Sequence, residues 1–211
     1  MRIREGQVFS LRVTSAPVPG CTMSERLGAG TVFSLAARTD ISPETHPEAK
    51  LLLVNAGRAR VTGQAPAEVG EGQAILIPAG ALLGAAADTD TIYTEIDIGR
   101  NAKMNENIIP GEVFTLAGLI PVREGRIVNM DVASNDSMKL ALMSFDAGTG
   151  LSDHAAPGDA LIFALEGEGI IRYEGTEHRI RAGEQFRFAR GGMHAVLADQ
   201  PFKMALLLTL K

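Results

Sequence analysis

The sequence predicts an all-β protein built from two copies of one domain. Three observations lead to this expectation: an internal repeat, short apolar segments bounded by turn residues, and the lack of a long helical periodicity. The chain has 211 residues, which is enough for two domains of about 100 residues each.

The repeat consists of four pairs of segments that recur in the same order. Residues 6–11 (Gly-Gln-Val-Phe-Ser-Leu) match residues 111–116 (Gly-Glu-Val-Phe-Thr-Leu) at an offset of 105. The other pairs, at offsets of 110 to 111, are 41–44 with 151–154, 51–57 with 161–167, and 70–80 with 181–191. A repeat of half the chain indicates two copies of one domain. We therefore expect domains at 1–103 and 104–211, divided in the polar stretch 101–107.

Each half reads as a series of short strands separated by turn signals. Turn pairs such as Glu174-Gly175 and Ala182-Gly183 separate the apolar segments of the second half. The strands expected there are 139–145, 160–165, 169–173, 177–180, 185–188, 194–198 and 203–210. The one exception is a short helical turn expected around 111–119. Strands at such regular spacing favour a β-sandwich or β-barrel.

The composition excludes several classes of protein. The chain has 25 acidic and 20 basic residues, a net charge of −5, and no basic block, so nucleic acid and anionic membrane are not expected partners. Its single cysteine, Cys21, forms no intrachain disulfide, which favours a reducing compartment. Residues 1–6 lack the apolar core of a signal peptide, and the apolar run 204–208 is far too short to span a membrane. We therefore expect a soluble, cytoplasmic protein.

Two glycine-rich motifs recur in the second half of the chain. The first consists of Gly148, His154, Ala156, Ala160 and Gly167, and the second of Gly183, Ala189, Gly191 and His194. They resemble the cupin motifs G-x5-H-x-H-x3–4-E-x6-G and G-x5-P-x-G-x2-H-x3-N, with alanine at the second histidine and at the glutamate. In the first half the matching positions are Glu44, His46, Gly57, Gly72, Pro78 and Gly80, with Leu83 at the last histidine and Ala49 and Lys50 at the glutamate.

This resemblance implies a bicupin, that is, two tandem jelly-roll β-barrels related by internal duplication. It further implies that the two barrels pair within the chain as a pseudo-dimer, and a homodimer of chains stays open. The phrase His-Ala-Ala-Pro-Gly-Asp-Ala at 154–160 resembles small cupin-2 proteins of mostly unassigned activity. We expect the first barrel to be degenerate, closed and apolar.

In the family, alternate strand residues place the motif side chains on the inner face of the barrel, where they bind one divalent metal such as Zn, Ni, Mn or Fe. His154 and His194 retain two of the four ligand positions, and metal sites of this kind need at least three protein ligands. Asp159 is the nearest candidate for a third ligand, although Pro-Gly-Asp is also ordinary turn chemistry. His178, beside the Glu174-Gly175 turn, is expected to be exposed.

Other residues could line the same pocket by their strand position. These candidates are Met143, Phe163, Met193 and either Phe186 or Phe188, although for each one individually plain core packing is the favoured role. Arg172 or Arg187 would favour an acidic ligand if either pointed inward.

Three functions remain open from the sequence. The first is a non-catalytic barrel that binds a small molecule through His154 and His194, and the sequence favours it narrowly. The second is a metal-dependent enzyme of the oxygenase or isomerase type with an incomplete metal site. The third is a structural or interaction protein that uses neither site. The missing ligands weigh against the second function, and the retained histidines weigh against the third.

Overall fold

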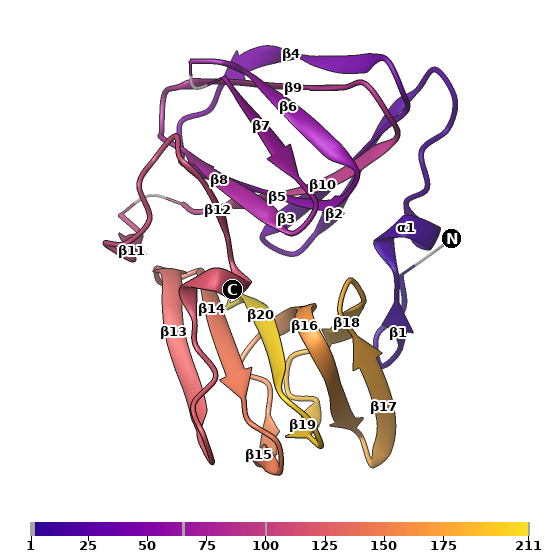
Figure 1. The fold of residues 1–211 in the computed structure, drawn as a ribbon, viewed down its shortest axis with the longest axis vertical. Coiled ribbons are helices and arrows are strands. Elements are labelled where there is room, and N and C mark those ends of the chain that lie inside the picture. The colour runs from indigo at the N-terminus through magenta and orange to yellow at the C-terminus, as the bar shows by residue number, and fades with distance from the viewer. Residues whose placement is uncertain (1–2, 65, 100, 211) are drawn as a thin grey trace. The chain divides into compact units, whose positions relative to one another are not determined.

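The computed structural model describes residues 3–64, 66–99 and 101–210. The chain is all-β apart from two short helical turns, and it forms two compact units (Figure 1). One unit comprises Leu11–Thr115, and the other comprises Leu116–Lys211 together with Met1–Ser10. The predicted fold class, two jelly-roll barrels in tandem, is confirmed.

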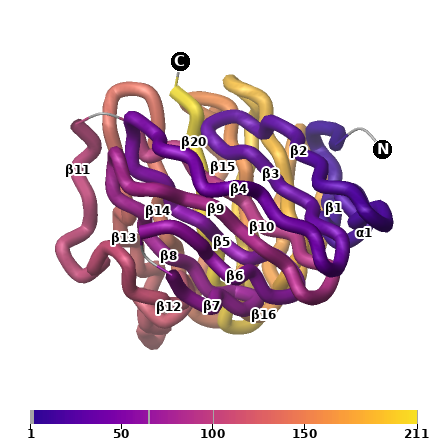
Figure 2. Tube along the Cα trace, turned by 90° about the horizontal axis from the view of Figure 1, so that it is seen from above, coloured from indigo at the N-terminus to yellow at the C-terminus, as the bar shows by residue number. Residues whose placement is uncertain are grey.

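The unit Leu11–Thr115, here called the N-terminal barrel, consists of two sheets around an apolar core. One sheet has the strand order β12-β8-β5-β10-β3-β2, and the other has the order β4-β9-β6-β7, whose strands run side by side in Figure 2. Leu52, Val54, Val61 and Ile75 are among the buried side chains between them. The elements are α1 (Leu11–Thr14), β2 (Thr22–Leu27), β3 (Gly30–Leu35), β4 (Thr39–Thr45), β5 (Lys50–Ala56), β6 (Arg58–Gly63), β7 (Ala67–Gly70), β8 (Gln73–Ile77), β9 (Leu82–Ala87), β10 (Thr91–Asp97), β11 (Lys103–Met104) and β12 (Val113–Thr115).

The second unit, here called the C-terminal barrel, repeats this plan. One layer has the order β1-β18-β16-β20-β14-β13, and in the other layer β19 pairs with β15 and β16, and β17 pairs with β16. The elements are β1 (Val8–Phe9), η1 (Ala117–Leu119), β13 (Ile127–Ser134), β14 (Met138–Phe145), β15 (Thr149–Ala155), β16 (Asp159–Tyr173), β17 (Thr176–Arg181), β18 (Gln185–Phe188), β19 (Met193–Ala198) and β20 (Phe202–Thr209). Phe145, Phe186, Phe188 and Phe202 are fully buried in its core.

Strand β16 belongs to both layers of the C-terminal barrel, because it bends near its middle. Residues up to Gly167 pair with β18 and β20, and residues from Glu168 pair with β17 and β19. Gly167 has a φ of +75°, and a Cβ atom there would overlap the carbonyl oxygen of Pro201. Only glycine tolerates both conditions, so this residue makes the corner that connects the two sheets.

Each barrel takes one edge strand from a segment that the repeat assigns to the other half. Val8 pairs with Phe186, and the Gly6 N–H donates to the Arg187 carbonyl at 3.0 Å. In the other repeat Val113 pairs with Ile75, and the Gly111 N–H donates to Leu76 at 2.9 Å. The compact units therefore differ from the predicted domains 1–103 and 104–211 at residues 1–10 and 104–115.

A search of the described residues for membrane-spanning helices found none of sufficient length and hydropathy.

Candidate functional site

Two antiparallel strands bring His154 and His194 together in the C-terminal barrel. The residues are direct cross-strand partners on β15 and β19, so their side chains project from the same face of the sheet. Val196 and Ala198 alternate with His194 along β19 and belong to the barrel core. The two histidines predicted from the motifs therefore meet on the face of this sheet that bears the core residues, with His194 buried and His154 exposed.

The imidazole rings lie against each other, with centroids 4.1 Å apart and planes inclined by 50°. Each Nδ1 atom faces a backbone carbonyl: His154 Nδ1 lies 2.9 Å from Ser152 O, and His194 Nδ1 lies 3.1 Å from Gly192 O. Because a carbonyl oxygen only accepts hydrogen bonds, each Nδ1 must carry the proton. In a neutral ring the Nε2 atom then keeps its lone pair, so both rings offer an acceptor or metal-ligating nitrogen.

The surroundings of His194 favour the neutral imidazole. The residue is 6% exposed, and burial lowers the pKa of its ring, with a smaller contribution from the neighbouring His154; the bond to Gly192 opposes this shift. Phe188 stacks on the ring at a centroid distance of 4.2 Å. Burial therefore favours the neutral, hydrogen-bond-accepting form of His194.

The two alanines of the motifs form the apolar part of this site. Ala156 and Ala160 are each 3% exposed and belong to the same core as Phe188. The Ala156 N–H donates to Gly192 O at 3.1 Å and its carbonyl accepts the Gly191 N–H at 2.9 Å, so the residue lies against the loop that precedes His194. Methyl groups thus occupy the positions where the family motif has its second histidine and its glutamate.

The structure places Asp159 at the first position of β16, directly after the bend at Pro157 and Gly158. Its side chain is exposed and Oδ1 accepts the backbone N–H of Arg190 at 3.0 Å. Among residues 3–64, 66–99 and 101–210, no group of three or more His, Cys, Asp or Glu side chains is arranged to hold a metal ion. The described donors at the site are two imidazoles, which does not match a metal centre with three or more protein ligands.

The other predicted pocket residues lie at different places. Met143 is buried in the barrel core. Phe163 is also buried, but Ile162 and Ala164 on either side of it belong to that core, so strand alternation places Phe163 on the opposite face of β16. Met193 is 44% exposed and precedes His194 on β19, so it too lies on the opposite face from the imidazole.

Tyr173 is a site residue that the sequence reasoning missed. It is the cross-strand partner of His194 on β16, and its ring lies 5.3 Å from that of Phe188. A Cβ atom on Gly192 would come within 2.5 Å of the Tyr173 ring, so this ring packs directly beneath the loop that holds His194. The motif spacing gave no signal for it, because only the strand register brings the two residues together.

Of two further residues of this barrel, His178 differs from expectation and Arg172 lies in a surface ion pair. His178 is half-buried and its ring lies 5.1 Å from that of Phe186, so the prediction that it is exposed was wrong. Arg172 makes an ion pair with Asp153 at 2.7 Å, and both side chains are at least one-third exposed. The described contacts therefore place the Arg172 guanidinium in a surface pair.

Residues 141–209 match the family model described as a cupin domain. A search of curated proteins found no match. Among solved structures, a cupin 2 conserved barrel domain protein from Leptotrichia buccalis is similar at a TM-score of 0.86 and 23% identity, over 99% of this chain and 98% of that chain. Salicylate 1,2-dioxygenase from Pseudaminobacter salicylatoxidans is similar at a TM-score of 0.67 and 12% identity, over 96% of this chain and 84% of that chain. A variant of that dioxygenase in complex with gentisate has a TM-score of 0.67 and 13% identity, over 96% and 81% of the two chains. At these identities the likeness shows the fold.

Proposed function

We propose that the chain, of which residues 141–209 match the cupin domain family, binds a small organic molecule in its C-terminal barrel through His154 and His194. One observation carries the proposal: both Nδ1 atoms are held by backbone carbonyls, so two adjacent rings present their Nε2 lone pairs. Such a pair suits a ligand with hydroxyl or N–H donors. The neighbouring Ala156, Ala160 and Phe188 suit an apolar or aromatic ligand body.

Phenolic molecules are the first probes to test. A phenol donates a hydrogen bond through its hydroxyl and presents an apolar ring, which are the two properties that the site complements. Gentisate occurs with a protein of the same fold, and catechol carries similar hydroxyl groups without a carboxylate. Both are small enough to compare in one titration series.

The proposed ligand site contains no metal ion, because the described residues offer too few ligands for one. The alanines at 156 and 160 leave two nitrogen donors, and Asp159, at the start of β16, accepts the backbone N–H of Arg190. Two imidazoles alone are expected to bind a divalent metal weakly. The metal-dependent enzyme remains an alternative outcome of the test below.

The test is calorimetric titration of the full chain with catechol and gentisate, and separately with Zn²⁺, Ni²⁺, Mn²⁺ and Fe²⁺. We expect a saturable phenol site that is lost in His154→Ala and in His194→Ala. His178→Ala is the matched control, since His178 belongs to the same barrel and packs on Phe186 instead. Phenol binding that persists in both site variants would overturn the proposal. Tight one-to-one metal binding that both site variants abolish would favour the enzyme.

The same proposal sets a pH dependence. Protonated imidazole has no lone pair, so binding needs the neutral rings. Because burial lowers the pKa of His194, its acceptor should persist below the ordinary histidine value of about 6.5. The contribution of His194 to phenol affinity should therefore be flat from pH 8 to 7 and fall only at more acidic pH.

We further propose a homodimer of chains as a state to test, which the sequence left open. Light scattering on the purified chain would give a mass of twice 22.3 kDa for the homodimer.

A further inference from the structure

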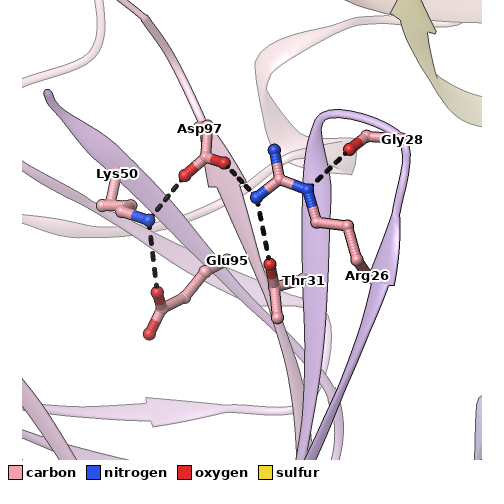
Figure 3. A network of polar contacts seen from close by, with 6 residues as sticks. All are labelled: Arg26, Gly28, Thr31, Lys50, Glu95 and Asp97. Carbon is pink, nitrogen blue, oxygen red and sulfur yellow. Dashed lines mark hydrogen bonds and ion pairs between the residues drawn. The ribbon is translucent and has the colours of Figure 1, made fainter.

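The N-terminal barrel contains an ionic cluster where an apolar interior was expected (Figure 3). Lys50, at the start of β5, is the cross-strand partner of Asp97 at the end of β10. Glu95 lies two residues earlier on β10, opposite Leu52, which belongs to the barrel core. Strand alternation therefore turns the side chains of Lys50, Glu95 and Asp97 toward the interior of this barrel.

The contacts in this cluster are unequal. Lys50 Nζ lies 2.5 Å from Asp97 Oδ1 but 3.8 Å from Glu95 Oε2. The Arg26 guanidinium lies 2.5 Å from Asp97 Oδ2 and also donates to Gly28 O at 2.9 Å and to Thr31 Oγ1 at 3.3 Å. Asp97 thus has two cationic partners, whereas Glu95 has one distant partner.

Exposure changes along the cluster. The side chains of Glu95 and Lys50 are 9% and 15% exposed, whereas that of Arg26 is 59% exposed. The cluster therefore runs from the barrel interior, at Glu95, to the surface, at Arg26.

Tyr93 supplies an independent sign of a missing partner. Its side chain is fully buried, and its hydroxyl makes no hydrogen bond within the described part of the chain. It lies two residues before Glu95, on the same face of β10, and its ring stacks on Phe33 at 5.1 Å. Burial, and then the charge of Glu95, raise the pKa of Tyr93, so the phenol stays protonated and can donate. A buried hydroxyl without a partner calls for an explanation, and a bound ligand is one.

We propose that this end of the N-terminal barrel binds a small monocarboxylate between the Lys50 ammonium and the Tyr93 hydroxyl, and that Glu95 takes up one proton when the ligand binds. Lys50 has three N–H donors, of which one binds Asp97 at 2.5 Å and a second faces Glu95 at 3.8 Å, so a third is left for a carboxylate oxygen. The inference concerns the other barrel and does not rest on the histidine pair.

The charge balance explains the coupling to a proton. Lys50 and Arg26 carry two positive charges, and Asp97 and Glu95 carry two negative charges when both are ionised. The groups around Glu95 are Lys50 on β5, Arg26 on β2, and Asp97 and Tyr93 on β10, while Thr31, its partner on β3, is uncharged. When Glu95 is neutral the cluster has one net positive charge and attracts one anion. Burial raises the pKa of Glu95, which places its protonation closer to neutral pH than for an exposed glutamate.

The test is calorimetric titration of the full chain with sodium acetate at pH 5 and pH 7, with sodium chloride at matched ionic strength as the blank. We expect saturable binding that is tighter at pH 5, by up to about tenfold per pH unit for one linked protonation. Repeating the pH 5 titration in two buffers of different ionisation enthalpy measures the protons taken up. Binding of inorganic phosphate in preference to acetate would overturn the carboxylate assignment, and the absence of acetate binding at pH 5 would overturn the site.

Three variants locate the binding. Glu95→Gln imitates the protonated acid, so its acetate affinity should be equal at pH 5 and pH 7. Tyr93→Phe and Lys50→Met should each weaken binding at least about tenfold, the loss of one hydrogen bond to a charged ligand. Lys203→Met is the matched control: Lys203 is 14% exposed and paired with Glu166 at 2.9 Å in the other barrel. If Lys50→Met does not fold, the other two variants still decide. Acetate affinity that is unchanged in Tyr93→Phe and still depends on pH in Glu95→Gln would refute the proposal.

Discussion

Replacing Gly167 with alanine tests whether the corner in β16 controls the stability of the C-terminal barrel. Two costs are expected. A non-glycine residue at positive φ costs about 1–2 kcal/mol. The added methyl group must also displace the Pro201 carbonyl, since it would overlap that oxygen, and overpacking of this kind costs about 1–3 kcal/mol. The free energy of unfolding should therefore fall by about 2–5 kcal/mol.

The control is Gly175→Ala in the turn between β16 and β17 of the same barrel. Gly175 has a φ of +80°, and a Cβ atom there would have no neighbour within 4 Å. This variant carries the conformational cost of about 1–2 kcal/mol without the overlap. The difference between the two variants thus isolates the close approach of the Pro201 carbonyl.

The assay is urea denaturation followed by the fluorescence of Tyr173, in a Tyr93→Phe background so that the only other tyrosine is removed. Tyr173 belongs to the C-terminal barrel, so the signal reports on the intended unit. With a denaturant slope of about 2 kcal/mol per M, a difference of 2 kcal/mol separates the midpoints by about 1 M. If Gly167→Ala costs no more than Gly175→Ala, the account of the corner is refuted.

Three further predictions concern the site. The pKa of His194, measured by NMR, should lie below that of free histidine because of burial. As the pH falls, the unfolded chain then binds a proton at this residue before the folded chain does, so the free energy of unfolding should fall below about pH 6.5. A free energy of unfolding that does not change with pH in this range would contradict the prediction. Phe188→Ala removes a fully buried ring and should lower the free energy of unfolding in urea by about 3–5 kcal/mol. It should also raise the pKa of His194, because the ring shields that imidazole from water. An unchanged pKa would show that Phe188 does not keep water from His194. Arg172→Ala breaks a pair with exposed Asp153 and should change stability by less than about 1 kcal/mol; a larger loss would show that the pair matters.

Most strands of the C-terminal barrel could be predicted from turn residues and apolar runs. The strand predicted at 185–188 matches β18, and the predicted turn around 111–119 contains the 3₁₀ turn Ala117–Leu119. Two strands predicted at 160–165 and 169–173 are one continuous strand, Asp159–Tyr173. The sequence suggested a break because Gly167 and Gly169 interrupt the apolar run, but glycine here bends the strand without ending its hydrogen bonding.

Strand β15, which carries His154, had no signal as a strand. Its burial alternates weakly and its last four residues are exposed, so it lacks the apolar periodicity on which strand prediction depends. The motif spacing nevertheless identified His154 and His194, because the family pattern records which positions face inward. Tyr173 has no place in the motif and was missed.

The ionic cluster of the N-terminal barrel is a second case in which strand register, and not local sequence, brings residues together. Lys50 and Asp97 are 47 residues apart, and the local sequence of neither strand predicts that these two residues pair. Only the register of β5 against β10 makes them partners. Apolar neighbours such as Leu51 and Leu53 suggested a closed apolar barrel, yet they lie on the face of β5 opposite to Lys50.

The repeat makes the difference between the barrels informative. Lys50 and Ala160 occupy equivalent positions at an offset of 110, as Leu83 and His194 do at 111. The C-terminal barrel therefore has the imidazole acceptor of His194 and the methyl group of Ala160 at these two positions. The N-terminal barrel has the apolar side chain of Leu83 and the ammonium donor of Lys50 there. Neutral acceptors select ligands that donate hydrogen bonds, whereas an ammonium group selects anions. Because these selections are opposite, catechol and acetate should not compete, and each should be lost only with the variants of its own barrel.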